Sequence, residues 1–184
     1  FEDVAVEAGV AMDNGAIGWG VTSLDFDNDG SRDLYFAMMD TSGMSANNAL
    51  FHNNGDGVFT EMGHASGADD PGPSLGVAAA DYDNDGWVDL VVGNYDRGYR
   101  LFHNDGARLV SHHWLALSLV GGGRVNRDAI GARVVVSTTD GRTQMQEVKA
   151  GSSVGAGETM ILHFGLGEAA VADVAVRWPD GSIQ

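Results

Sequence analysis

The chain has 184 residues and no cysteine, which excludes a disulfide framework and thiolate metal sites. Its formal net charge of −16 at pH 7 disfavours nucleic acid as a partner, because phosphates attract lysine and arginine, and it disfavours docking on anionic membrane. A hydrophobic content of 43% supports a packed core, and no apolar run approaches the roughly 18 residues of a membrane span.

In chain order, the first half consists of short strand-like segments arranged in two repeated units. Runs of β-branched and aromatic residues bounded by Gly, Asn and Asp predict strands in the first unit at 20–24, 34–38, 49–52 and 58–61. The second unit has the same order, with strands predicted at 76–80, 90–93, 100–103 and 108–110.

Several segments of the first unit recur in the second in the same order, 51 to 58 residues further along. One is Leu-Phe-His-Asn, which ends at Asn53 and again at Asn104. Four antiparallel strands per unit at this period are typical of β-propeller blades. We therefore predict a partial β-propeller of about two blades. Two blades do not close a ring, so either the chain is cut from a longer propeller or partner chains complete it.

An acidic nine-residue loop follows the first strand of each unit. Carboxylates stand at loop positions 1, 3, 5 and 9, and position 6 is Gly, which can enter positive φ at a sharp bend. Ca²⁺ takes six to eight oxygen ligands, and alternate residues of a tight loop can point oxygens at one centre. We predict two Ca²⁺ sites, formed by Asp25, Asp27, Asp29, Asp33 and the Ser31 carbonyl, and by Asp81, Asp83, Asp85, Asp89 and the Trp87 carbonyl.

The alternative interpretation of these loops is an acidic surface turn without an ion, since Asp, Asn and Gly are ordinary turn residues. Identical spacing in two copies favours the metal site. An EF-hand is excluded, because position 12 is Phe36 in one copy and Val92 in the other, where that motif needs a bidentate Glu.

The acidic repeat stops near Ser111, which divides the chain into predicted domains at residues 1–111 and 112–184. The first domain has 19 acidic and 4 basic side chains, whereas the second has 7 and 6. Alternating and β-branched segments predict a small β-sandwich or barrel-like domain in the second part, with strands at 113–120, 131–138, 143–150, 159–164 and 171–178. A further strand is expected beyond the turn that ends at Gly181, so the C-terminus is interpreted as truncated.

A charged segment, Asn126-Arg127-Asp128 with nearby Arg133, leaves two interpretations open. One is a hydrogen-bonded loop in which an arginine pairs with an aspartate and fixes the entry to a strand. The other is a polar ligand site for a glycan or a peptide.

These motifs together resemble two known families. The Asp-x-Asp-x-Asp-Gly-x-x-Asp loops, each followed by a strand and Leu-Phe-His-Asn, resemble FG-GAP/VCBS-type repeats, which form calcium-binding propeller blades. The second domain is similar to the ASPIC/UnbV domain, which follows such repeats in secreted acidic proteins and bacterial relatives. The segments that carry this second resemblance are Asn126–Val134, Leu162–Gly167 and Val176–Gly181.

The resemblance and the loops imply an extracellular, secreted, cell-surface or periplasmic interaction or adhesion module with structural Ca²⁺. No enzyme is expected, because no His-Glu-x-x-His motif is present and the equivalent placement of His52 and His103 favours a structural role. A protein or glycan is the expected partner. The alternatives are a part in polysaccharide processing or enediyne-like natural-product biosynthesis, and a self-assembling surface protein that forms homo-oligomers.

Overall fold

The computed structural model describes residues 1–12, 15–40, 42, 46–95, 97–106, 111–151, 153 and 156–184. Strands form nearly all of the regular structure in these residues, and the strands lie in four antiparallel sheets. The all-β prediction is confirmed. Among the described residues, no helix is long and apolar enough to cross a membrane.

The first unit is a four-stranded sheet in the order β1-β2-β3-β4. Its strands are β1 (Ala16–Leu24), β2 (Asp33–Asp40), β3 (Ala49–Asn53) and β4 (Phe59–Glu61), close to the four predicted segments. A four-residue helix, α1 (Gly63–Ser66), follows β4 and was not predicted from the sequence. It ends at Gly67, whose φ of 80° is left-handed and therefore suits glycine.

The second unit is a three-stranded sheet of β5 (Ser74–Ala80), β6 (Asp89–Asn94) and β7 (Gly98–Phe102). Three of its four predicted strands are confirmed. The fourth, at 108–110, lies outside the described residues. The segments between β1 and β2 and between β5 and β6 are the two acidic loops, here called loop 1 (residues 25–33) and loop 2 (residues 81–89).

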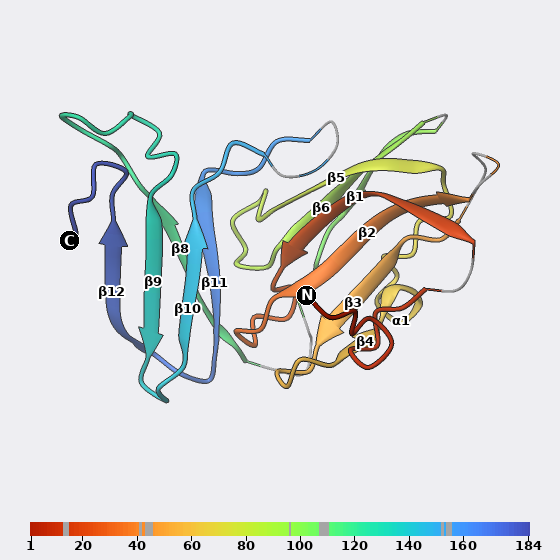
Figure 1. Ribbon diagram of the computed structural model, residues 1–184, viewed down its shortest axis with the longest axis horizontal. Helices are drawn as coiled ribbons and strands as arrows, with labels where there is room; N and C mark the ends of the chain where they lie inside the picture. The colour runs from red at the N-terminus through yellow and green to blue at the C-terminus, as the bar shows by residue number, and fades with distance from the viewer. Residues whose placement is uncertain are drawn as a thin grey trace.

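The two units pack face to face and share one apolar core (Figure 1). A side chain at Gly20 would place its Cβ 2.9 Å from the Leu75 carbonyl oxygen, so the two backbones can approach only because glycine stands there. The first unit thus needs glycine at this position of β1. The buried residues of this core are Leu24, Tyr35, Ala37, Leu50, Ala68, Val77, Val88, Leu90 and Val92.

The tail domain (residues 112–184) contains the remaining strands in two sheets, in the orders β10-β9-β12 and β11-β8. Both sheets contribute to a second core that includes Val134, Phe164 and Val176. This arrangement is sandwich-like, and the described residues do not close a barrel. The strands are β8 (His113–Ser118), β9 (Arg133–Thr138), β10 (Thr143–Glu147), β11 (Ile161–Gly167) and β12 (Val171–Arg177).

The tail domain lies beside the two units, and the acidic loops are at the junction (Figure 1). The Gly167 amide donates to the Asn28 carbonyl oxygen at 2.8 Å, and the His112 ring donates from Nδ1 to the Asp27 carbonyl oxygen at 2.7 Å. Loop 1 is therefore held between its own sheet and the tail domain.

Candidate metal centre

Loop 1 brings its predicted carboxylates together. One oxygen each from Asp25, Asp27 and Asp33 lies within 4.8 Å of the others. The Asp25 carboxylate accepts hydrogen bonds from the amides of Gly30 at 3.0 Å and Asp29 at 3.1 Å, which wraps the backbone around it. The Asp25 and Asp33 side chains are buried, at 1% and 0% exposure.

Loop 2 repeats this geometry almost atom for atom. Oxygens of Asp81, Asp83 and Asp89 lie within 4.8 Å of one another. The Asp81 carboxylate accepts from the amides of Gly86 at 3.0 Å and Asp85 at 3.1 Å. Loop 2 differs in exposure, because Asp83 and Asp85 are exposed. The same nine-residue pattern therefore forms the same cradle in two different surroundings.

The carboxylate at position 9 ties each loop to a neighbouring strand end. Asp33 accepts hydrogen bonds from the amides of Phe26 at 3.0 Å and Asn53 at 2.8 Å. Its counterpart Asp89 accepts from the amide of Asn104 at 2.7 Å and from the amide of Tyr82 at 3.1 Å. These bonds fix the position 9 oxygens before any ion is present.

Two histidines that the sequence analysis left out of the site lie against the loops. The Nε2 of His52 is 3.2 Å from an Asp27 oxygen, and the Nε2 of His103 is 2.9 Å from an Asp83 oxygen. Each histidine forms a metal-compatible group with the carboxylates at positions 3 and 5 of its loop. The sequence signal for them is the repeated Leu-Phe-His-Asn motif, whose Asn is the amide donor to position 9.

The electrostatics of loop 1 favour a bound cation. Burial, together with the nearby charges of Asp29, Asp33 and Asp27, raises the pKa of Asp25 to about 8. Burial also raises the pKa of Asp33 to about 6, although hydrogen bonds from Asn53 and Phe26 oppose this shift. Ionised carboxylates at such short separations repel one another unless a cation lies among them.

The donor set fits Ca²⁺ by its chemistry, because it consists of hard carboxylate oxygens on a loop with a glycine bend. The two predicted carbonyl ligands lie within the same loops: the Ser31 amide donates to Asp29 at 2.6 Å, and the Trp87 amide donates to Asp85 at 2.9 Å. The assignment of the Ser31 and Trp87 carbonyl oxygens as ligands stays a prediction, as does the assignment of the eight carboxylates.

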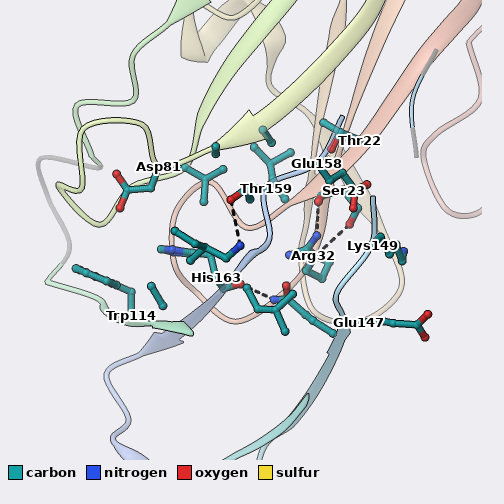
Figure 2. Close-up of a pocket in the computed structure, with 18 of the residues that line it drawn as sticks. Thr22, Ser23, Arg32, Asp81, Trp114, Glu147, Lys149, Glu158, Thr159 and His163 are labelled. Atoms are coloured by element: carbon teal, nitrogen blue, oxygen red, sulfur yellow. Dashed lines mark hydrogen bonds between the residues drawn. The ribbon is translucent and has the colours of Figure 1, made fainter. Parts of the chain in front are cut away.

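A cleft of about 630 Å³ lies between the two units and the tail domain. Figure 2 shows Arg32, which donates to Ser23, and His163 among the residues that line this cleft. Burial lowers the pKa of His163 to about 4, so its ring is neutral at pH 7. The Trp114 ring stacks on His163 with centroids 5.7 Å apart. Charged residues that line the cleft include Arg32, Asp81, Glu147, Lys149 and Glu158.

The Asn126 segment is a hydrogen-bonded loop. The Asn126 side chain accepts from the Ile130 amide and donates to the Ile130 carbonyl oxygen, both at 2.9 Å. The expected pairing of an arginine with an aspartate in this loop is wrong for Arg133, whose Nε donates to Glu147 at 2.6 Å. The two residues face each other across paired strands β9 and β10, which brings them closer than the loop does.

Comparison with known families identifies both parts of the chain. Residues 25–92 match the FG-GAP-like repeat family, and residues 122–184 match the ASPIC and UnbV family. The FG-GAP-like match spans both acidic loops, and FG-GAP repeats imply that the two units are propeller blades. Both family resemblances predicted from the sequence are therefore confirmed.

The chain is also distantly similar to cartilage acidic protein 1 of three species. It is 27% identical to the Homo sapiens protein over 175 residues, which is 89% of this chain and 25% of that protein. Identity to the Mus musculus protein is 28% over 175 residues, with 89% and 26% covered. For Xenopus tropicalis it is 27% over 167 residues, with 89% and 26% covered. The chain thus spans about a quarter of the length of these relatives.

Proposed function

We propose that this chain, which combines an FG-GAP-like repeat with an ASPIC and UnbV domain, is a calcium-stabilised, non-enzymatic interaction module. Each acidic loop binds one Ca²⁺, and the ion holds the hairpin that carries the loop. The single observation that supports this most is that the same arrangement occurs in both loops: in each, one oxygen from each of three carboxylates lies within 4.8 Å of the others.

The ion's role in this proposal is structural. Without a cation, the convergent carboxylates of each loop destabilise the native state through repulsion and burial. An ion that binds only the folded protein contributes its binding free energy to folding. The hydrogen bonds that already shape each loop explain why calcium would find a preformed site.

The decisive experiment compares thermal unfolding and metal content with and without calcium. We expect two Ca²⁺ per chain by calorimetric titration and a rise of the unfolding temperature when a chelator is replaced by millimolar Ca²⁺. Mg²⁺ at the same concentration is the control, since it prefers stricter octahedral geometry at shorter distances. Equal unfolding temperatures in chelator and calcium would contradict the proposal.

An extracellular or periplasmic location follows from the same proposal, because millimolar calcium there fills even moderate sites. A protein or glycan is the proposed partner. Large apolar side chains are exposed on β1 of the first blade and on β6 and β7 of the second, and they support a role in contact formation: Ile17, Trp19, Val21, Val91, Tyr99 and Leu101.

The cleft between the two units and the tail domain supports a second candidate, an accessory or catalytic part in polysaccharide processing or natural-product biosynthesis. Besides Asp81 of loop 2, it contains the carboxyl side chains of Glu147 and Glu158, together with Lys149. Acid–base chemistry requires such groups in a cleft. A turnover screen on sugars and polysaccharides, repeated with Glu158→Gln, tests this candidate, and turnover that is unchanged in the variant would count against it.

A further inference from the structure

The two acidic loops differ at position 4, although both carry asparagine there. Asn28 and Asn84 share a left-handed backbone, with φ of 58° and 63°. Asn28 is completely buried, at 0% exposure, whereas Asn84 is exposed. Among the described residues, the Asn84 side chain makes no hydrogen bond, so the loop fold itself does not require the asparagine side chain.

The Asn28 side chain joins three separate parts of the chain. Its Nδ2 donates to the Gly86 carbonyl oxygen of loop 2 at 2.8 Å. Since that nitrogen faces a carbonyl, its Oδ1 must accept, and the Nε2–H of His163 in β11 donates to it at 2.7 Å. The Asn28 backbone carbonyl accepts from the Gly167 amide at 2.8 Å. Loop 1, loop 2 and the tail domain therefore meet at one buried residue.

Each of these contacts depends on a loop conformation that an ion would stabilise. Asn28 stands between Asp27 and Asp29, so its position follows the arrangement of the loop 1 carboxylates. The Gly86 amide donates to Asp81 of loop 2, and the Gly86 carbonyl oxygen accepts from Asn28 of loop 1. The position of Gly86 therefore depends on the conformation of both loops. A second hydrogen bond is donated from the second unit to loop 1: Asn104 Nδ2 donates to the Phe26 carbonyl oxygen at 2.7 Å.

The tail domain is packed closely enough against loop 1 to respond to its conformation. A Cβ at Gly165 would overlap the Asp25 carboxylate and the Asn28 backbone. The Arg142 guanidinium donates to the Asp29 carbonyl oxygen and, at 2.7 Å, to the Leu166 carbonyl oxygen. A displaced loop 1 would lose these contacts, and an undocked tail would leave them unsatisfied.

We propose that Asn28 is a positioning residue that couples the two calcium loops to each other and to docking of the ASPIC and UnbV domain. Binding at either loop favours the conformation that the other loop and β11 contact, so the three events are linked. Such coupling is reciprocal, and a typical strength changes affinity by about 5-fold or more. This inference rests on the proposed calcium function and adds that the two sites are not independent.

The test uses matched glycine substitutions, because glycine keeps the left-handed backbone and removes only the side chain. We expect the wild type to bind two Ca²⁺ with positive cooperativity and to gain amide-exchange protection in 161–167 on calcium addition. Asn28→Gly should still bind calcium, but independently at the two loops, with the apparent affinity lowered about 5-fold or more. Asn84→Gly should behave as the wild type.

A third variant, His163→Phe, separates the two connections. It removes one of the bonds between loop 1 and the tail domain, the one from His163 to Asn28, while leaving the bond from Asn28 to Gly86. We expect it to keep cooperative calcium binding and to show a smaller calcium-dependent gain of amide-exchange protection in 161–167 than the wild type. If Asn28→Gly does not fold in calcium, as judged by circular dichroism, then the wild-type isotherm and His163→Phe decide the question.

The outcomes distinguish this inference from the function on which it rests. A wild type that binds no calcium overturns both. A wild type that binds two ions independently, with no exchange response in the tail, overturns the coupling alone. Equal behaviour of Asn28→Gly and Asn84→Gly also overturns the assignment to Asn28.

Discussion

At the scale of single residues, the most consequential feature is the burial of ionisable groups in loop 1. Asp25 has a raised pKa because burial removes the water that would solvate its charge and three aspartates add repulsion. Asp33 is equally buried, but amide donors from Phe26 and Asn53 compensate part of that cost. Hydrogen bonds offset the cost of burying the charge less well at Asp25 than at Asp33. The protonation of Asp25 is therefore expected to govern the stability of the protein in the absence of metal.

The first prediction concerns pH in the presence of a chelator. The native pKa of Asp25, about 8, lies above its ordinary value of 3.8, so the native state binds more protons between these values and unfolding becomes easier as pH rises. We expect the unfolding temperature in chelator to fall from pH 6.5 to 8. Calcium keeps the carboxylates ionised and should remove that fall.

Asp25→Asn mimics the protonated side chain, so it should affect the stability of the metal-free protein and of the calcium-bound protein in opposite directions. At pH 8 in chelator, the variant should be more stable than the wild type by about 1–3 kcal/mol, the usual cost of an uncompensated buried polar group. In calcium it should be less stable than the wild type. Asp173→Asn, an exposed change on β12, is the control. Denaturant unfolding measures both, and a variant destabilised in chelator would contradict the prediction.

The second prediction compares the two asparagines of the repeated Leu-Phe-His-Asn motif. Asn104 Nδ2 donates to Phe26 in the other unit at 2.7 Å and to Val88 at 3.1 Å, whereas Asn53 Nδ2 donates to Arg32 of its own unit at 3.1 Å. Asn104→Ala should therefore cost about 1–3 kcal/mol and more than Asn53→Ala. Urea unfolding in saturating calcium gives both values, and an equal cost would show that the bond to Phe26 adds nothing.

At the scale of elements, strand β11 decides how the tail domain meets the blades. Its last residues cover loop 1, and its register against β8 shifts between Gly165 and Gly167. The absence of side chains at these positions lets the strand lie directly on the Asp25 and Asn28 backbone region. The junction is therefore set by backbone contact and by a few polar side chains.

The third prediction tests that contact with a single methyl group. Gly165→Ala would place a Cβ on the Asp25 carboxylate and the Asn28 backbone, so β11 must move away from loop 1. We expect a loss of stability of about 1–3 kcal/mol, as for other overpacked sites, and weaker calcium binding. Gly122→Ala, where nothing lies within 4 Å of the added Cβ, is the matched control. Equal stability of the two variants would mean that β11 is free to shift.

At the scale of the whole molecule, the two blades pack against each other and leave some large apolar side chains exposed elsewhere on their strands. On the second blade, Val91 pairs with Leu101 across β6 and β7, and both are exposed. On the first blade, the exposed Trp19 and Val21 lie on β1. Blades in propellers bury such faces against neighbouring blades, because one unit cannot bury its own face. We therefore expect these surfaces to take part in contacts.

The fourth prediction is that this chain alone self-associates through those faces in calcium. Leu101→Asp and Trp19→Asp should each reduce the mass-average size at high concentration, because a charge cannot be buried between apolar sheets without a large cost. Val120→Asp, at an isolated exposed position in the tail domain, should leave association unchanged. Light scattering across a concentration series measures this, and a monomeric wild type at every concentration would contradict it.

The sequence by itself determined the local structure and the loops. Strand positions follow from β-branched runs and turn residues, and the convergence of Asp25, Asp27 and Asp33 follows from their spacing around Gly30, because these contacts are local. Only the tertiary structure decided that loop 1 is more buried than loop 2. It also placed Asn28 against Gly86 and His163, which are 58 and 135 positions away. The two loops share the positions of their aspartates, asparagine and glycine, and the burial of loop 1 arises from the tail domain that packs on it at Gly165.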